Sequence, residues 1–320
     1  MKSVVAAVLL LVSHFSYSLE KDFRIRDPFV LVDGGKYYLY ESKPWFGGTG
    51  VGVRVSTNLV DWTGKKMVMT LPEDVKVQAV WAPEVHKYKG RYYLFATITE
   101  DKSAREIKPM NDEVDKSNLV PRGTWVFAAD SPEGPFKHVK KGPVPPAELQ
   151  TLDGTLYVED GKAYMVYCHE WCQNWNGTIE YAPLSEDFSS FTAPPKKILD
   201  ARSAMKGAWV ITDGPFLFRS EKSSRLYMIW SNVIKGSGYC VLVRSSPSGK
   251  IAGPWTKDEI LYGKDGGHGM VFRDIAGRLC LTIHQPNSSP DERMRIFELK
   301  DDGMRLSLAQ NANKSAGMKK

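Results

Sequence analysis

Four acidic residues and one histidine stand near the start of short, similar segments spread along the chain. They are Asp27, Glu84, Asp153, Asp213 and His268. Hydrolysis of a glycosidic bond needs two carboxyl groups, one ionised as a base or nucleophile and the other protonated as an acid. A third carboxylate nearby raises the pKa of the acid, because like charges disfavour a second ionisation. If the fold brings these side chains together, they form a set suited to glycoside hydrolysis.

The segments that carry these residues are five copies of one pattern. Each copy has a small or polar entry, a short strand, a glycine-containing turn and an aromatic-rich strand. The copies begin at Arg26, Trp81, Leu152, Thr212 and Gly267. Their Asp-Gly, Lys-Gly and Gly-Gly turns are typical of β-hairpins. Two more strands and a closing aromatic residue follow each of the first four hairpins.

These repeats predict an all-β fold. Four strands per unit, in five units that recur roughly every 60 residues, indicate a five-bladed β-propeller with four-stranded antiparallel blades around a central channel. The first strand of each blade lines the channel in such a fold, so we expect the five entry residues to occupy the same position in every repeat and to converge at one rim. Like-charge repulsion makes such a ring of carboxylates costly, which favours a functional cluster.

Short motifs in this order resemble those of glycoside hydrolase family 43, the arabinanase, arabinofuranosidase and xylosidase family. They are Arg26-Asp27-Pro28, Trp81-Ala82-Pro83-Glu84, Leu152-Asp153-Gly154-Thr155-Leu156 and Gly267-His268-Gly269. The resemblance covers nearly all of residues 24–300. It implies a glycosidase that cleaves α-L-arabinofuranosyl or β-D-xylosyl linkages of plant-type polysaccharides or oligosaccharides with inversion.

The resemblance also implies roles for single residues. Asp27 corresponds to the general base, and Asp153 to the residue that tunes the pKa of the proton donor and orients it. His268 corresponds to a histidine beside a central metal ion or water, so a central Ca²⁺ is an expected ligand. Hydrolysis of a glycoside by two carboxyl groups and a water molecule requires no cofactor.

The proton donor is where this sequence departs from the family pattern. The family usually has Glu-Gly-Pro or Glu-Ala-Pro in the fourth repeat, whereas this chain has Asp213-Gly214-Pro215. Aspartate is one methylene shorter, and a misplacement of about 1 Å costs on the order of a hundredfold in rate. Glu170 is the rival donor, because it follows the second strand of the third repeat and so returns to the rim of Asp153. Both Asp213 and Glu170 remain candidates.

Several other residues are predicted to bind the sugar. They are Trp45, Trp81, Glu84, His169 and Trp171, and Arg122 is a further candidate for contact with hydroxyl groups. Indole rings offer flat apolar faces against which the C–H face of a sugar packs. Two other functions are compatible with the repeats: a related five-bladed hydrolase of fructan or algal galactan, and a carbohydrate-binding propeller without catalysis. Retention of both Asp27 and Asp153 argues against the second.

The N-terminus predicts export. Lys2 precedes the apolar run Val4 to Val12, and the small-residue pattern Ser16-Tyr17-Ser18 follows. Such a segment is typical of a signal peptide and is too short to span a bilayer. We therefore expect a signal peptide at residues 1–18, a secreted or periplasmic location, a catalytic propeller at 19–308 and a flexible C-terminal tail at 309–320.

Composition limits the partners. The 320 residues carry a formal net charge of +6, with basic and acidic residues mixed along most of the chain. No basic run has the density of a nucleic-acid groove, and no later apolar run is long enough to span a membrane. We expect a monomer that binds a carbohydrate. The four cysteines, Cys168, Cys172, Cys240 and Cys280, are predicted to be buried free thiols.

Overall fold

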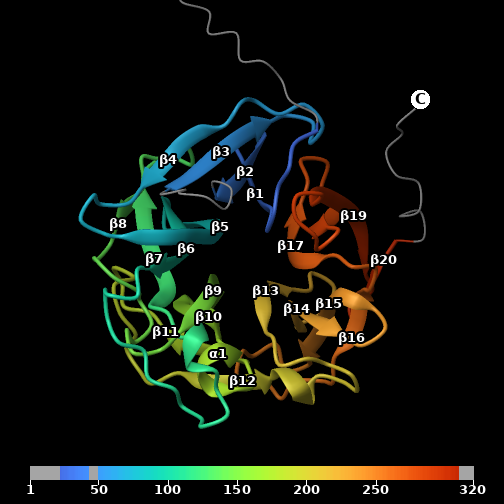
Figure 1. Ribbon diagram of the computed structural model, residues 1–320. Helices are drawn as coiled ribbons and strands as arrows, with labels where there is room; N and C mark the ends of the chain where they lie inside the picture. The colour runs from blue at the N-terminus through green and yellow to red at the C-terminus, as the bar shows by residue number, and fades with distance from the viewer. Residues whose placement is uncertain (1–21, 43–49, 310–320) are drawn as a thin grey trace, which may run out of the picture.

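The computed structural model describes residues 22–42 and 50–309. These residues form five four-stranded antiparallel sheets in a ring (Figure 1), which confirms the predicted five-bladed β-propeller. Within this part of the chain, no helix is long and apolar enough to cross a membrane. The signal peptide predicted at 1–18, Trp45, and all but the first residue of the tail predicted at 309–320 lie outside the described residues.

Each blade uses four consecutive strands. Blade one has β1 (Phe29–Asp33), β2 (Lys36–Ser42), β3 (Gly50–Ser56) and β4 (Lys66–Thr70). Blade two has β5 (Val77–Tyr88), β6 (Arg91–Glu100), β7 (Arg122–Ala129) and β8 (Lys137–His138). Blade three has β9 (Thr151–Glu159), β10 (Lys162–His169), β11 (Thr178–Pro183) and β12 (Lys196–Asp200). Blade four has β13 (Asp213–Arg219), β14 (Leu226–Ile234), β15 (Gly238–Ser246) and β16 (Glu259–Tyr262). Blade five has β17 (Gly267–Arg273), β18 (Leu279–Gln285), β19 (Arg293–Asp301) and β20 (Leu306–Leu308).

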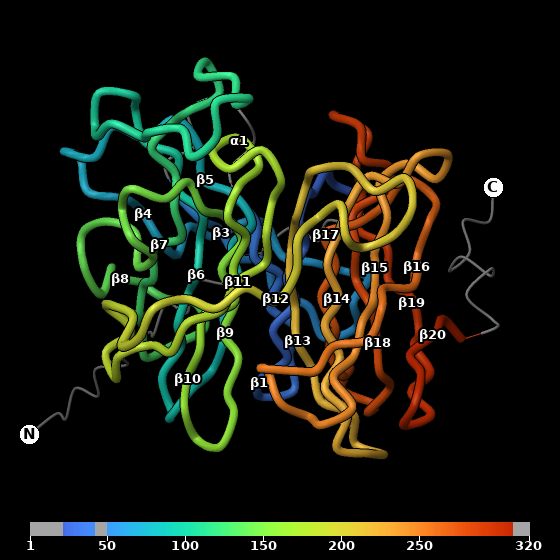
Figure 2. The backbone as a smooth tube through the Cα atoms, turned by 90° about the horizontal axis from the view of Figure 1, so that it is seen from below, coloured from blue at the N-terminus to red at the C-terminus, as the bar shows by residue number. Residues whose placement is uncertain are grey.

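The repeat pattern is complete in the fifth blade as well, where the sequence indicated only the first hairpin. Short helical turns join some of the strands: η1 (Lys116–Asn118), α1 (Trp171–Asn174) and η2 (Ala201–Ser203). Figure 2 shows the outer strands β4 and β8 at one side of the molecule and β16 and β20 at the other, with β1, β9 and β13 between them. Figure 1 shows β1, β5, β9, β13 and β17 around the centre of the ring, so the first strands face the channel, as the sequence predicted.

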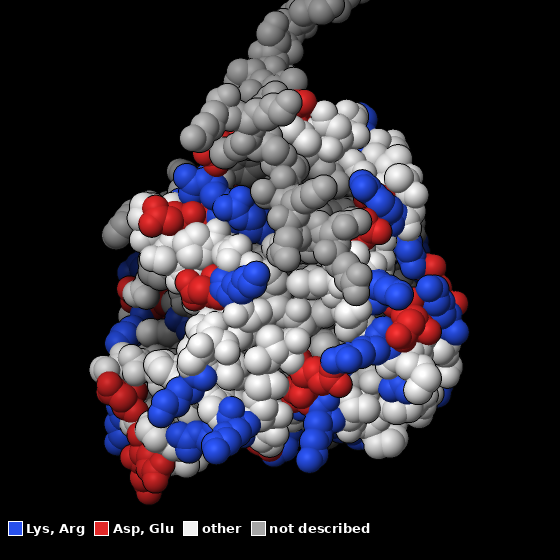
Figure 3. Space-filling view, turned by 90° about the vertical axis from the view of Figure 1, so that its right-hand side faces the viewer, with Lys and Arg blue, Asp and Glu red and all other residues white. Residues whose placement is uncertain are grey.

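The core consists of apolar side chains packed between neighbouring blades. Aromatic residues that close the first three repeats are buried in it, namely Trp62, Phe136 and Phe188. The cysteines form no disulfide, and Cys168, Cys240 and Cys280 are buried free thiols, as predicted. Cys172 is a free thiol but only half-buried. On the face shown in Figure 3, lysine and arginine side chains are interspersed with aspartate and glutamate.

Blades one and five share no strand, so side chains and loops close the ring. Strands β1 and β17 are neighbours, although they are far apart in sequence. The amide of Ile25 donates to the carbonyl of Glu292 at 3.3 Å, and Arg24 pairs with the Glu292 carboxylate at 2.7 Å. This closure fixes the segment that leads into β1, and that segment carries Asp27.

A β-bulge at the entry of the first strand positions the channel-mouth residues. In blades two to five, two residues of the first strand lie opposite one residue of the second. The first residue of each such pair has a positive φ, and the equivalent pair in blade one lies just ahead of β1. These first residues are Asp27 (φ 51°), Ala82 (φ 42°), Asp153 (φ 53°), Gly214 (φ 48°) and His268 (φ 48°). A bulge changes the direction in which a side chain points, and often does so beside active sites.

The bulges correct the predicted alignment of the repeats. Asp27, Asp153 and His268 do share one position, as expected. Glu84 and Asp213 do not: Glu84 lies two residues beyond the bulge position of blade two, and Asp213 lies one residue before that of blade four. The prediction that all five entry residues occupy the same position is therefore wrong for these two blades, where Ala82 and Gly214 occupy it.

Candidate active site

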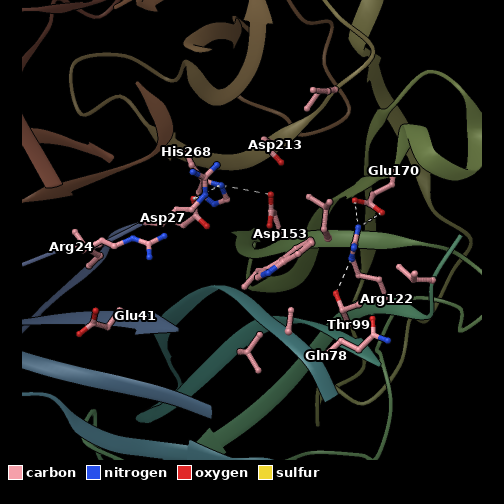
Figure 4. A pocket seen from close by; sticks show the side chains of 18 of the residues that line it. Arg24, Asp27, Glu41, Gln78, Thr99, Arg122, Asp153, Glu170, Asp213 and His268 are labelled. Carbon is pink, nitrogen blue, oxygen red and sulfur yellow. Dashed lines mark hydrogen bonds and ion pairs between the residues drawn. The ribbon is translucent and has the colours of Figure 1, made fainter. Parts of the chain in front are cut away.

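A cleft of about 750 Å³ gathers residues from the entry of the first strand of every blade. Asp27, Asp153, Asp213 and His268 line it together (Figure 4). Four of the five predicted entry residues therefore meet at one place, although they lie far apart in sequence.

Asp27 is flanked by two histidines. Its Oδ1 lies 3.3 Å from Nδ1 of His268 and 3.2 Å from Nδ1 of His284. Burial acts to raise the pKa of Asp27, but the charges of His268 and His284, a hydrogen bond from His284 and the charge of Arg26 outweigh it and hold the pKa well below its usual range. An ionised carboxylate results, and it can accept a proton from a water molecule.

Asp153 and Asp213 form a second, different group. The backbone amide of Gly214 donates to Oδ2 of Asp153 at 2.9 Å, and the hydroxyl of Tyr239 donates to Oδ2 of Asp213 at 2.8 Å. Burial raises the pKa of Asp153 to about 8, against the opposing hydrogen bond from Gly214. Burial and the neighbouring charge of Asp153 raise the pKa of Asp213 to about 7. The pair therefore holds a proton near neutral pH and can donate it.

Gly214 is required by this arrangement. Other residues adopt a similar φ at this position in the other four blades, so the close approach is decisive: an added Cβ would lie 2.9 Å from Cδ2 of the His268 ring. The backbone at this point therefore packs directly against His268 and presents its amide to Asp153. This close approach places Asp213, the preceding residue, beside Asp153.

Glu170 lines the same cleft, but it is held by a cation. Nη1 of Arg122 lies 2.6 and 2.7 Å from its two carboxylate oxygens, and the side-chain amide of Gln150 also donates to Oε2. Arg122 in turn donates from Nε to Thr99 at 2.9 Å and places its guanidinium 4.2 Å from the centre of the Trp81 ring. With both oxygens engaged, Glu170 is poorly placed to donate a proton to a substrate.

The other predicted substrate-binding residues fall into two groups. Trp81 and Trp171 line the cleft, although the guanidinium of Arg122 covers one face of Trp81. Glu84 and His169 do not line it. Glu84 bonds to His86 at 2.9 Å, because its position beyond the bulge places it further along the channel. His169 is buried against Gln173, at 2.9 Å, behind the turn that carries Glu170. Their positions argue against contact with a substrate.

Three residues offer ligand atoms at the predicted central metal site. Asp153, Asp213 and His268 each offer a ligand atom, and these atoms lie within 4.8 Å of one another. Calcium ligands lie about 2.3–2.6 Å from the ion, so this spacing is compatible with a cation. Direct coordination would however require both aspartates to be ionised, in competition with the proton that the pair holds. The residues fit an ion beside His268 better than one bound by the two aspartates.

Comparison with known proteins identifies the family. The profile described as "Glycosyl hydrolases family 43" matches residues 21–308. The chain belongs to glycoside hydrolase family 43. This confirms the resemblance found in the sequence motifs and shows that the protein is a glycosidase.

Solved structures of family 43 enzymes are similar to it. An endo-arabinase from Bacteroides thetaiotaomicron is 31% identical with a TM-score of 0.77, over 90% of this chain and 99% of that chain. An α-L-arabinofuranosidase from Lactobacillus brevis is 16% identical with a TM-score of 0.68, over 92% and 94% of the two chains. An exo-1,5-α-L-arabinanase from a bovine ruminal metagenomic library is 19% identical with a TM-score of 0.65, over 92% and 99%. The last two show a shared fold only.

Two side chains of this family 43 hydrolase were not found by sequence reasoning. Tyr239 lies in the third strand of blade four and His284 in the second strand of blade five, so neither belongs to an entry motif. Their contacts with Asp213 and Asp27 depend on how adjacent blades pack. The repeat pattern carries no signal for such contacts, because each residue has its partner in another strand or another blade.

Proposed function

We propose that this family 43 glycosidase hydrolyses α-L-arabinofuranosyl linkages with inversion, and that β-D-xylosyl linkages are its second candidate substrate. The endo-arabinase at 31% identity, matched over nearly the whole of both chains, supports arabinan-type substrates. β-D-Xylosides are the second candidate substrate because the sequence motifs resemble the whole family rather than its arabinanases alone.

The observation that carries the proposal is the contrast between Asp27 and the Asp153–Asp213 pair in one cleft. Histidines hold the pKa of Asp27 low, whereas burial raises the pKa values of the pair to about 8 and 7. Two carboxyl groups in opposite protonation states are what hydrolysis of a glycoside requires.

Each residue then has one role. Asp27 takes a proton from water, and the oxygen of that water forms the new bond to the anomeric carbon. Asp213 gives its proton to the glycosidic oxygen as the bond to the departing sugar breaks. Asp153 shares a proton with Asp213, so the pair keeps one proton until the pH reaches about 7 to 8. We prefer Asp213 to Glu170 as the acid because Arg122 and Gln150 engage both Glu170 oxygens.

Product stereochemistry and a substrate panel test this function. We expect hydrolysis of aryl α-L-arabinofuranosides and arabino-oligosaccharides, with the inverted anomer as the first product seen by proton NMR. Aryl β-D-xylosides, fructans and algal galactans form the comparison set, and Asp27→Asn is the inactive control. Retention of configuration would exclude this mechanism, and binding without turnover would favour a carbohydrate-binding propeller instead.

We also propose a Ca²⁺ ion beside His268, held mainly by water. His268 would supply one nitrogen, and water molecules would supply most of the other ligands. Exhaustive chelation should then lower the melting temperature or the activity, and added Ca²⁺ should restore it. If neither changes, the ion has no part in the protein.

Export is the last part of the proposal. Cleavage after about Ser18 should leave a mature protein that starts close to Leu19. N-terminal sequencing of protein recovered from the medium or periplasm checks this. An intact Met1 on the recovered protein would contradict it.

A further inference from the structure

A buried tyrosine contacts the proposed acid from a part of the fold that the entry motifs do not include. Tyr239 lies on β15 and is 3% exposed, and its hydroxyl donates to Oδ2 of Asp213 at 2.8 Å. The ring stacks on the imidazole of His284, with 5.7 Å between ring centres and an angle of 21°. His284 is itself fully buried and lies 3.2 Å from Oδ1 of Asp27. One stacked pair of rings therefore contacts both the proposed base and the proposed acid.

Neighbouring groups hold this stacked pair rigidly. Nε2 of His284 lies 3.1 Å from the side-chain oxygen of Asn287, which also accepts a hydrogen bond from Arg26 at 2.7 Å. On the other side, the backbone of β17 packs against the tyrosine ring: a Cβ added at Gly267 would lie 2.4 Å from Cε1 of Tyr239. The ring cannot move without disturbing β17 or His284, so its hydroxyl has a fixed position.

The hydrogen bond decides which oxygen of Asp213 can carry a proton. A hydroxyl that donates to a carboxyl oxygen occupies a lone pair there and favours the unprotonated state of that oxygen. Oδ2 receives the Tyr239 hydrogen bond, so Oδ1 is the oxygen left to hold the transferable proton. Aspartate has a short side chain, and such a bond also fixes the plane of its carboxyl group.

We propose that Tyr239 is a positioning residue for Asp213, which holds the carboxyl group so that the proton on Oδ1 is directed toward the glycosidic oxygen. This inference rests on the proposed function, because it requires Asp213 to be the acid. Tyr239 acts through Asp213 and has no proton-transfer step of its own. The groups that face Asp213 are Asp153 from β9, Asp27 ahead of β1, His268 from β17 and Tyr239 itself.

The test is the variant Tyr239→Phe, which removes one oxygen atom and keeps the ring. Without the hydroxyl, Asp213 can rotate and its proton can reside on either oxygen. We expect kcat to fall about tenfold or more on substrates with a poor leaving group, since misplacement of a reacting group has costs of this order. Substrates with an activated aryl leaving group, which can depart unprotonated, should change by about threefold or less, and KM should stay near the wild-type value.

Tyr167→Phe is the matched control. Tyr167 is also fully buried and donates its hydroxyl to a carboxylate, Glu180, at 2.9 Å, but it does not line the cleft. This variant should leave the leaving-group dependence unchanged. An equal effect in both variants would mean that any lost buried hydroxyl is enough, and would overturn the proposal.

A double-mutant cycle separates this inference from the proposed function. In the Asp213→Ala background, Tyr239→Phe should have no further effect on leaving-group dependence, because the residue that it positions is gone. If Asp213→Ala shows no leaving-group dependence, the assignment of the acid fails. If Asp213→Ala shows it and the folded Tyr239→Phe does not, or if the two effects simply add, Asp213 remains the acid and Tyr239 is not its positioning residue.

Discussion

The cleft contains two arrangements of buried carboxylates that differ in their partners. Asp153 and Glu170 are equally exposed, at 6% each, so burial does not distinguish them. Asp153 has a backbone amide and a second carboxyl group beside it, and no lysine or arginine of the described residues forms an ion pair with it or with Asp213. Glu170 has the guanidinium of Arg122 against both of its oxygens. Equal burial thus yields a carboxyl group with a raised pKa in one place and half of an ion pair in the other.

The comparison teaches that the partners of a carboxyl group decide what it can do in this cleft. Burial without a lysine or arginine partner raises the pKa of the Asp153–Asp213 pair, although the charge of the nearby His268 opposes the rise at Asp213. A buried arginine instead neutralises a carboxylate in place. Asp27 is an intermediate case, because its nearest partners are the imidazoles of His268 and His284, and Arg26 lies further away. Substitution of these residues separates the three arrangements, and the expected effects differ in size.

Loss of Asp27 should have the largest effect. Asp27→Asn replaces an ionised carboxylate with an amide that cannot accept a proton. We expect kcat to fall by about 10² or more on every substrate, the usual size for loss of a general base. Steady-state kinetics checks this, with the melting temperature as a control for folding. Turnover close to that of the wild type in a folded variant would refute the role of Asp27.

The next effect compares Asp213 with Glu170 directly. Asp213→Ala should reduce kcat on natural glycosides by about 10²-fold and spare substrates with activated aryl leaving groups, because those leave without protonation. Glu170→Ala should reduce the activity more evenly, because it releases Arg122 from its place over Trp81. The slope of log kcat against leaving-group pKa distinguishes them. A steeper slope for Glu170→Ala would reverse the assignment.

The pH dependence should reflect the Asp153–Asp213 pair. As pH rises through about 7 to 8, the pair loses its proton and the donor is lost, so kcat should fall on the basic side. Asp153→Asn removes the negative neighbour that raises the pKa of Asp213, and the basic limb should therefore move to lower pH. Glu170→Gln is the control and should leave the limb in place. An unmoved limb in Asp153→Asn would show that the two aspartates are not coupled.

The sequence predicted the ring of blades and most of the cluster, because both follow from a local repeat. Asp27, Asp153 and His268 were placed correctly since each lies in a short entry motif that leads into a channel-lining strand. The expected position was wrong for Glu84. A β-bulge adds a residue to the first strand, so the position of a residue relative to the bulge cannot be counted from the pattern of polar and apolar residues alone. Ala82 and Gly214 occupy the bulge position in their blades, and neither has a side chain with a functional group that would mark it in the sequence.

The partners of the cluster could not be predicted from the sequence. Arg122 and Glu170 come from different blades, and their ion pair depends on how β7 packs beside the turn after β10. The same holds for the contact of Tyr239 with Asp213 across blade four. A resemblance of motifs suggests which residues react, but only the packing of the blades shows which carboxylate has an arginine against it.

The smallest expected effect is on the melting temperature, which should rise in Asp153→Asn and fall in Glu170→Gln. The folded-state pKa of Asp153, about 8, lies above the value of 3.8 for the unfolded chain. Between these values the folded state binds more protons than the unfolded state, so the free energy of unfolding falls as pH rises. Asp153→Asn removes this titration and should raise the melting temperature, with a larger gain at pH 8 than at pH 5.

The same change of carboxylate to amide should be harmful at Glu170. Glu170→Gln leaves the guanidinium of Arg122, whose side chain is 12% exposed, without its carboxylate. Loss of one partner of a buried charged pair costs about 1–3 kcal/mol or more, so the melting temperature should fall at both pH values. Glu221→Gln, at an exposed ion pair with Arg273, is the matched control and should change the melting temperature little. Thermal unfolding at the two pH values measures all three variants, and shifts of the same sign for Asp153→Asn and Glu170→Gln would show that the two carboxylates do not differ in the way proposed.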